Sequence, residues 1–212
     1  MIEMRNARLG TLLATALAAV LLFAPPARAD FVFSLEPGIT ASAGSTGNSF
    51  DVLLTNTGPS SVTIGGFSFG ITAADPAINF TEANISTTAD TYIFNGDSLF
   101  GPTISTLTGQ TLEASDFSAS SGTAIGSGVT FGVGHILFNV DSGATPGPIA
   151  VTFEDAPTTS LSDADGNDIA FTTVPGAITI TSPATVPEPS TEAFLACAFA
   201  ALAIARGRRR SL

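Results

Sequence analysis

Short stretches in which apolar residues alternate with polar ones, or run together, recur along most of the chain. They are rich in Val, Ile, Thr and Phe, and clusters such as AGSTGN, NTGPSS and DSGATPG separate them. A period of two places successive side chains on opposite faces of a strand, and Gly, Ser, Asn, Asp and Pro favour turns. The pattern predicts strands over residues 31–35, 49–55, 67–72, 149–153 and 177–181.

Residues 90–128 give a weaker pattern, because Gly, Ser and Thr are abundant there. Two interpretations remain open for this stretch: strands mixed with long loops, or one short helix near residues 112–117. No helical period precedes residue 190, and no internal repeat or second domain boundary is found. Short strands with frequent turns predict one all-β domain over residues 30–181, a sandwich or a barrel.

The charged residues divide the chain into a central part and two ends. The chain has no lysine, and its seven basic residues are arginines that lie before residue 29 or after residue 205. Of the 18 acidic residues only Glu3, Glu188 and Glu192 lie outside residues 30–186, which leaves 15 inside. A surface of this sign repels phosphate, so nucleic acid is excluded as a partner. Divalent cations and neutral partners such as sugars fit better.

The N-terminus has the pattern of a secretory signal peptide over residues 1–29. Arg5 and Arg8 precede an apolar run over residues 9–23, and Ala-Arg-Ala at 27–29 provides small residues at a cleavage site before Asp30. The alternative is an uncleaved membrane anchor. We therefore expect the protein to be exported.

Cysteine usage bears on how an exported domain is stabilised. The only cysteine is Cys197, which lies in the C-terminal apolar run. The exported domain can therefore form no internal disulfide. Its stability must come from core packing, with bound metal ions as a further possible source.

Two segments resemble cohesin domains. Residues 61–85, SVTIGGFSFGITAADPAINFTEANI, place a Gly-Gly-Phe strand before an Asp-Pro turn and a second strand. Residues 134–180 continue with an apolar strand, an Ala-Thr-Pro-Gly turn, another strand, a Ser-Asp-Ala-Asp-Gly-Asn turn and a closing Gly-x-Ile-x-Ile strand. The order and spacing agree over roughly residues 34–181. The resemblance implies a nine-stranded, cohesin-like, jelly-roll β-sandwich.

The resemblance says less about function than about fold. Cohesins hold dockerin modules in cellulosomes, but this chain contains no dockerin, no second cohesin and no scaffold linker. One fold hosts many functions, so dockerin binding is not carried over. A non-catalytic binding or structural module is the expectation.

The turn DADGND is the candidate metal site. Asp163, Asp165, Asn167 and Asp168 provide oxygen ligands of the kind that Ca²⁺ prefers. The turn is not an EF-hand loop, because its glycine comes too early and its twelfth position is Val174. The same residue types are common in ordinary turns. A calcium site and a plain turn therefore both remain open.

No set of residues marks a catalytic centre. His135 is the only histidine, no Gly-x-Ser-x-Gly motif is present, and a structural or edge-strand histidine is expected. The many acidic residues leave open a secreted polysaccharide hydrolase, although nothing singles out a carboxylate pair. A carbohydrate-binding module is the other alternative, but Trp is absent and Tyr92 is the only tyrosine. Few flat rings are therefore available to stack on a sugar.

The C-terminal segment, residues 182–212, consists of a polar spacer and three further features. These are the triplet Pro187, Glu188 and Pro189, an apolar run predicted to form a helix at about 191–205, and the arginines Arg206, Arg208, Arg209 and Arg210. Such a helix is roughly 20 to 22 Å long, short of a hydrocarbon core of about 30 Å. The arginines would hold its end in the cytoplasm, with the preceding domain outside.

This arrangement resembles the PEP-CTERM sorting signal of Gram-negative bacteria that secrete extracellular polysaccharide. The resemblance implies that an exosortase, a membrane-embedded cysteine protease, recognises the Pro187–Pro189 region and processes the chain. The expected destination is the outer surface or the extracellular matrix, after a transient membrane stage. The expected partners there are exopolysaccharide or a surface protein. The alternative is an unprocessed tail anchor.

Overall fold

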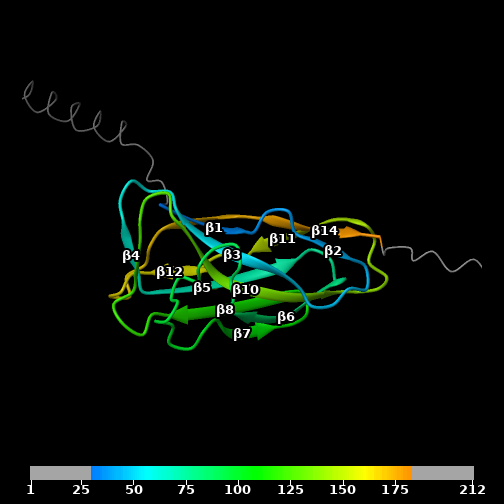
Figure 1. Ribbon diagram of the computed structural model, residues 1–212, viewed down its shortest axis with the longest axis horizontal. Coiled ribbons are helices and arrows are strands. Elements are labelled where there is room, and N and C mark those ends of the chain that lie inside the picture. Colours follow the sequence, from blue (N-terminus) through cyan, green and yellow to red (C-terminus); the bar gives the residue numbers. More distant parts are fainter. Residues whose placement is uncertain (1–29, 183–212) are drawn as a thin grey trace, which may run out of the picture.

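The computed structural model describes residues 30–182, and this part of the chain is built of fourteen strands (Figure 1). Their bounds are β1 (Phe31–Leu35), β2 (Thr40–Ser42), β3 (Asn48–Asn56), β4 (Val62–Ile64), β5 (Gly66–Ala73), β6 (Ile78–Asn84), β7 (Thr103–Leu107), β8 (Thr111–Phe117), β9 (Thr123–Ile125), β10 (Thr130–Val140), β11 (Gly147–Phe153), β12 (Ser160–Ser162), β13 (Phe171–Val174) and β14 (Gly176–Thr181). Within residues 30–182, no helix is long and apolar enough to cross a membrane. The predicted signal peptide and nearly all of the predicted sorting segment lie outside the described residues.

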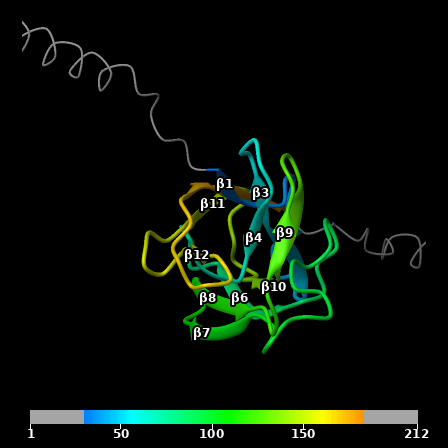
Figure 2. The same ribbon diagram turned by 90° about the vertical axis from the view of Figure 1, so that its left-hand side faces the viewer.

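Two sheets form a β-sandwich around the core. The five-stranded sheet has the order β13-β1-β3-β10-β6, and the seven-stranded sheet has the order β2-β14-β11-β5-β8-β7, with β12 paired to β5. The remaining strands, β4 and β9, form a short ribbon at the end of the molecule that faces the viewer in Figure 2. The sandwich places one edge of each sheet, β6 and β7, on the same side of the molecule (Figure 1).

The chain begins and ends the sandwich with parallel pairs of strands. β1 pairs in parallel with β13, and β2 pairs in parallel with β14. β1 and β14 themselves lie in different sheets, and the two ends of the described chain leave the sandwich at opposite ends of the long axis (Figure 1).

The five strands predicted from periodicity are confirmed as β1, β3, β5, β11 and β14, within two residues at each end. In β1 the reason is plain, because Phe31, Phe33 and Leu35 are buried while Val32 and Ser34 are half-buried. Nine of the fourteen strands have five or more residues, and the other five have three or four. The resemblance implied nine strands, and the fourteen strands of the structure exceed this number by five short ones.

The helix considered near residues 112–117 is wrong. These residues form β8, which pairs with both β5 and β7. Leu112, Ala114 and Asp116 are buried and alternate with half-buried residues, which is the period of a strand. The letters Leu-Glu-Ala suit a helix, but pairing on both sides of the strand overrides this weak local preference.

Phenylalanine dominates the core between the sheets. The fully buried rings are Phe31, Phe33, Phe50, Phe67, Phe69, Phe94 and Phe138. Several of the rings touch one another: Phe67 is stacked on Phe69 at a centroid distance of 6.1 Å and on Phe94 at 5.8 Å. Large aromatic surfaces contribute much of the stability of a core, which suits a domain whose sequence contains no cysteine.

Candidate binding groove and the carboxylates behind it

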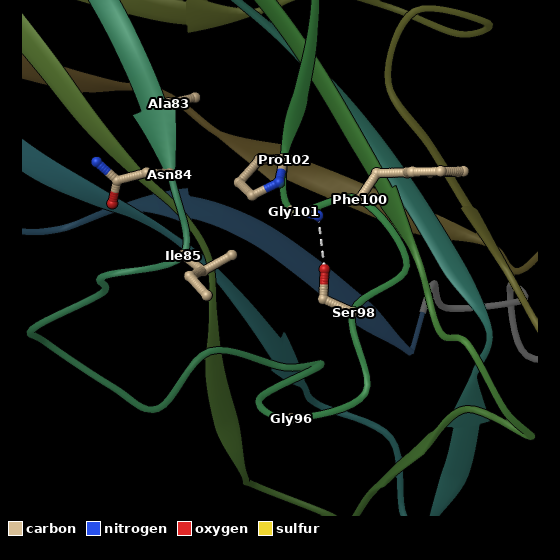
Figure 3. A pocket seen from close by; sticks show the side chains of 8 residues that line it. All are labelled: Ala83, Asn84, Ile85, Gly96, Ser98, Phe100, Gly101 and Pro102. Carbon is tan, nitrogen blue, oxygen red and sulfur yellow. Dashed lines mark hydrogen bonds between the residues drawn. The ribbon is translucent and has the colours of Figure 1, made fainter.

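A groove with a volume of about 580 Å³ lies where the edges of the two sheets meet (Figure 3). One wall is the end of β6 and the residue that follows it, and the other is the loop over residues 96–102 that leads into β7. The lining residues are Ala83, Asn84, Ile85, Gly96, Ser98, Phe100, Gly101 and Pro102. In Figure 3, Ile85 and Pro102 lie on facing walls, whereas the Phe100 side chain projects from the loop away from Ile85.

Exposed apolar side chains gather around this groove. The apolar patch consists of Ile85 and Phe100, which line the groove, and Leu99, the chain neighbour of Phe100; their side chains are 46%, 74% and 50% exposed. Ile85 lies beside Gly101, the neighbour of Phe100, and the backbone N–H of Leu99 donates to the carbonyl oxygen of Phe117 at 2.9 Å. Exposed large hydrophobic residues that cluster, rather than lie singly, indicate an interaction surface.

Asp116 fixes the loop that carries much of this patch. It is fully buried on the core side of β8, and its carboxylate accepts four hydrogen bonds. The donors are the hydroxyls of Tyr92 at 2.7 Å and Ser98 at 2.6 Å, and the backbone N–H groups of Phe117 at 2.8 Å and Phe100 at 3.3 Å. All four donors are neutral. The groove loop is thus held in place by an acidic group that no cation balances within residues 30–182.

The hydroxyl of Tyr92 is held in its protonated form by this environment. Burial raises the pKa of Tyr92 far above its usual value, and the hydrogen bond to Asp116 and the negative charge of that residue raise it further. Ionisation of the phenol would place two negative oxygens 2.7 Å apart in the interior. Tyr92 therefore keeps its proton, and donates to Asp116, well above the pH at which a free tyrosine ionises.

We expect the stability of the domain to fall as the pH rises above about 10, the ordinary pKa of tyrosine. The pKa is raised in the folded state, so the stabilisation is fully present below the unfolded pKa and is lost as the unfolded chain gives up its proton. Tyr92 is the only tyrosine and the chain has no lysine, so no second residue of these types obscures the effect. Absorbance at 295 nm should report phenolate only as the protein unfolds. Tyr92→Phe should abolish the alkaline loss, and phenolate in folded protein near pH 10 would contradict the prediction.

A second buried carboxylate, Asp51, holds the loop between β6 and Tyr92. It lies on β3, it is fully buried, and its Oδ1 is 2.6 Å from Nδ1 of His135 on β10. Its Oδ2 accepts hydrogen bonds from the backbone N–H groups of Thr88 at 2.5 Å and Ala89 at 2.6 Å. His135 is therefore a structural residue, as expected. It is not on an edge strand, because β10 lies between β3 and β6.

The sequence did not single out Asp51 and Asp116 as residues that organise the loops of a site. The available signal for Asp116 is its spacing, since it follows Leu112 and Ala114 at inward-facing positions of one strand. A carboxylate at an inward-facing position must find hydrogen-bond partners, which predicts a polar network there. Asp51 gives no such signal, because it points to the outer face and is covered only by a loop from elsewhere in the chain.

The predicted calcium turn forms hydrogen bonds within itself. Oδ1 of Asp163 accepts from the backbone N–H groups of Asp165 at 2.9 Å and Asn167 at 2.8 Å, and its Oδ2 accepts from the Asn167 side chain at 2.9 Å. These hydrogen bonds, first those from Asn167, lower the pKa of Asp163. Gly166 has a φ of 81°, which explains the glycine. In residues 30–182, no three Asp, Glu, His or Cys side chains lie close enough to share a metal ion.

Calcium binding by this turn remains a hypothesis, and metal removal tests it. Asp163 already accepts three hydrogen bonds in the turn, so we expect the melting temperature to be the same in excess calcium and in excess EDTA. Asp165→Ala, which alters an exposed side chain, should have the same temperature in both conditions. A rise with calcium that Asp165→Ala abolishes would instead show that the turn holds the ion.

The residues predicted for sorting cannot be placed in this geometry. Pro187, Glu188 and Pro189 lie outside the described residues, as do Arg206, Arg208, Arg209 and Arg210. Their roles remain predictions from the sequence.

No protein-family model and no curated protein matches the sequence. The fold is similar to those of solved cohesin domains. One is the sixth cohesin of scaffoldin B from Acetivibrio cellulolyticus, solved with a dockerin, at a TM-score of 0.54 and 15% identity over 71% of this chain and 99% of that one. Another is a type I cohesin–dockerin complex from Clostridium thermocellum, with a TM-score of 0.54 and 14% identity over 76% of this chain and 99% of that one. A third is a non-cellulosomal cohesin from the archaeon Archaeoglobus fulgidus, with a TM-score of 0.53 and 16% identity over 73% of this chain and 93% of that one. The cohesin-like β-sandwich is thus established as the fold.

Proposed function

We propose that this chain is an exported, non-catalytic binding or structural module of the cell surface or extracellular matrix. The observation that carries the proposal is the apolar patch, because three exposed apolar side chains lie at one groove, and two of them belong to a loop that a buried carboxylate anchors. Complexes between cohesins and dockerins are among the solved structures with a similar fold, which supports binding of a protein.

The destination of the protein follows from its two ends. The basic and apolar start of the chain supports export, and the Pro187–Pro189 triplet, apolar run and arginines support sorting by an exosortase. In this proposal the C-terminal helix holds the chain in the inner membrane of a Gram-negative bacterium only until processing. The domain then reaches the outer surface or the matrix, in association with exopolysaccharide.

Sorting is tested by the mass of the mature C-terminus. The full chain would be produced in a Gram-negative bacterium that has an exosortase and secretes polysaccharide, and in the same strain without the exosortase. We expect the surface protein of the first strain to end before Arg206, and the second strain to retain the chain in its membrane. The double change Pro187→Ala with Pro189→Ala should also be retained, whereas Pro183→Ala in the spacer should be sorted normally. An intact arginine tail on surface protein would contradict the proposal.

Absence of catalysis is tested on the polysaccharide of the same host. We expect the purified protein to leave the length distribution of the polymer unchanged after prolonged incubation. Shortening of the polymer that a single Asp or Glu substitution abolishes would show that the chain is a hydrolase.

A further inference from the structure

We propose that the groove and the apolar patch bind a segment of a partner protein in which an apolar side chain is flanked by Arg or Lys. This inference rests on the proposed function as a binding module and adds the chemistry of the ligand. It follows from three observations: the apolar surface, its rigid support and the sign of the charge around it.

The apolar part of the ligand is required by the patch. Phe100 is 74% exposed, although phenylalanine is otherwise the main residue of this core. Its backbone N–H donates to Asp116, and the N–H of Gly101 donates to Ser98 Oγ at 2.6 Å (Figure 3). The loop is thus ordered before any ligand binds. Binding to a preorganised surface avoids the entropy cost of ordering it, so the apolar area is available to a partner.

The cationic part of the ligand is required by the charges around the groove. Asp116 lies directly behind the backbone of Phe100, Asp97 lies in the loop between two lining residues, and Glu82 is exposed on β6. Their hydrogen-bond donors are neutral: hydroxyls for Asp97, the Asn84 amide for Glu82 at 2.8 Å, and the four groups described above for Asp116.

No arginine or lysine occurs anywhere in residues 30–182 to offset these charges. The potential over the groove is therefore negative, which attracts cationic groups and repels anionic ones.

The same charges disfavour the other possible occupants. A second copy of this domain would bring two strongly acidic surfaces together. The arginines of the chain's own C-terminus have the right sign, but in the proposed topology they lie across the membrane from the domain. A neutral polysaccharide would gain no attraction from the negative potential over the groove, and an acidic polysaccharide would be repelled by it.

The experiment measures binding of a fluorescent peptide to the purified full-length chain in mild detergent. The probe is the hexapeptide RRLFRR, compared with EELFEE, which reverses the charge, and RRSSRR, which lacks the apolar residues. We expect only RRLFRR to bind measurably, with an affinity that falls as salt is added. Phe100→Ser and Ile85→Ser should each weaken it about tenfold or more, the effect expected of a central apolar contact.

The matched control is Val174→Ser. Val174 is 50% exposed, but it lies on β13, at the edge of the five-stranded sheet opposite to β6. This variant should bind the probe like the unchanged chain. The melting temperatures of the three variants should agree closely, because each altered side chain is 46% exposed or more.

Four results would overturn the inference. Equal binding of EELFEE, or binding of RRLFRR that is unaffected by both groove variants, would show that the ligand chemistry or the site is wrong. Self-association that Phe100→Ser abolishes would assign the patch to a second copy of the chain. Binding of host polysaccharide that Phe100→Ser abolishes, without any peptide binding, would assign the patch to a glycan. Export and processing of Phe100→Ser should be normal in either case, so failure here is distinguishable from failure of the proposed function.

Discussion

Asp116→Ala is expected to lower the free energy of unfolding by about 3 to 5 kcal/mol. Four donors lose their acceptor at once, and each buried donor left without a partner costs about 1 to 3 kcal/mol, less where water can enter the space. For a domain of this size the melting temperature should fall by about 10 °C. Calorimetry and urea unfolding at neutral pH would measure both quantities.

Two variants separate the network from a general effect of losing charge. Tyr92→Phe removes one of the four hydrogen bonds and should cost only about 1 kcal/mol. Asp165→Ala removes an exposed carboxylate of the same chain and should change stability by less than about 0.5 kcal/mol. If Asp116→Ala costs no more than Asp165→Ala, the carboxylate does not organise the loop, and the rigid support claimed for the groove is lost as well.

Phe69→Ala should destabilise the domain by about 3 to 5 kcal/mol, because it removes a fully buried ring from the centre of the core. The surroundings are packed closely enough that a Cβ placed on Gly134 would come within 2.9 Å of the Phe69 ring. The ring also stacks on Phe67. Collapse around the vacated space is therefore limited, and most of the cost should be realised. Denaturant unfolding measures the difference.

The matched control for this prediction is a phenylalanine of the same domain that lies in water. Phe100→Ala removes the same atoms from a side chain that is 74% exposed, so it should leave the stability almost unchanged. Phe69→Leu retains most of the volume and should cost less than Phe69→Ala. Similar losses for Phe69→Ala and Phe100→Ala would show that the two rings are not buried differently.

The strands could be predicted from sequence wherever one face of the strand meets the core. In β1 and β14 the buried residues alternate with more exposed ones, so the pattern carries its own register. The segment between β6 and β7 could not be assigned in the same way. Its buried residues Tyr92, Ile93 and Phe94 are consecutive, because they lie in a loop that closes the sandwich instead of in a strand.

The groove could not be predicted because its parts are distant in sequence. Ile85 follows β6, the edge strand of one sheet, and Phe100 lies in the loop that leads to β7, the edge strand of the other. Each is a large apolar residue, a type that usually belongs to the core, and nothing in its neighbours marks it as exposed. Only the structure, in which the edge strands β6 and β7 lie on the same side of the molecule, shows that these residues are exposed at one groove. The DADGND motif shows the reverse: it is conspicuous in the sequence, yet in the structure its residues form the hydrogen bonds of an ordinary turn.

The pairing of the last strand, β14, on both of its sides determines how the domain would respond to mechanical force. The chain continues beyond Ser182, so a pull transmitted through that continuation enters at Thr181, along the axis of β14. This strand lies between β2, parallel to it, and β11, antiparallel to it. Since sheet hydrogen bonds run across the strands, such a load must shear both ladders at once and cannot break their bonds one by one. A domain tethered by its C-terminus in this way can bear tension without first losing its last strand.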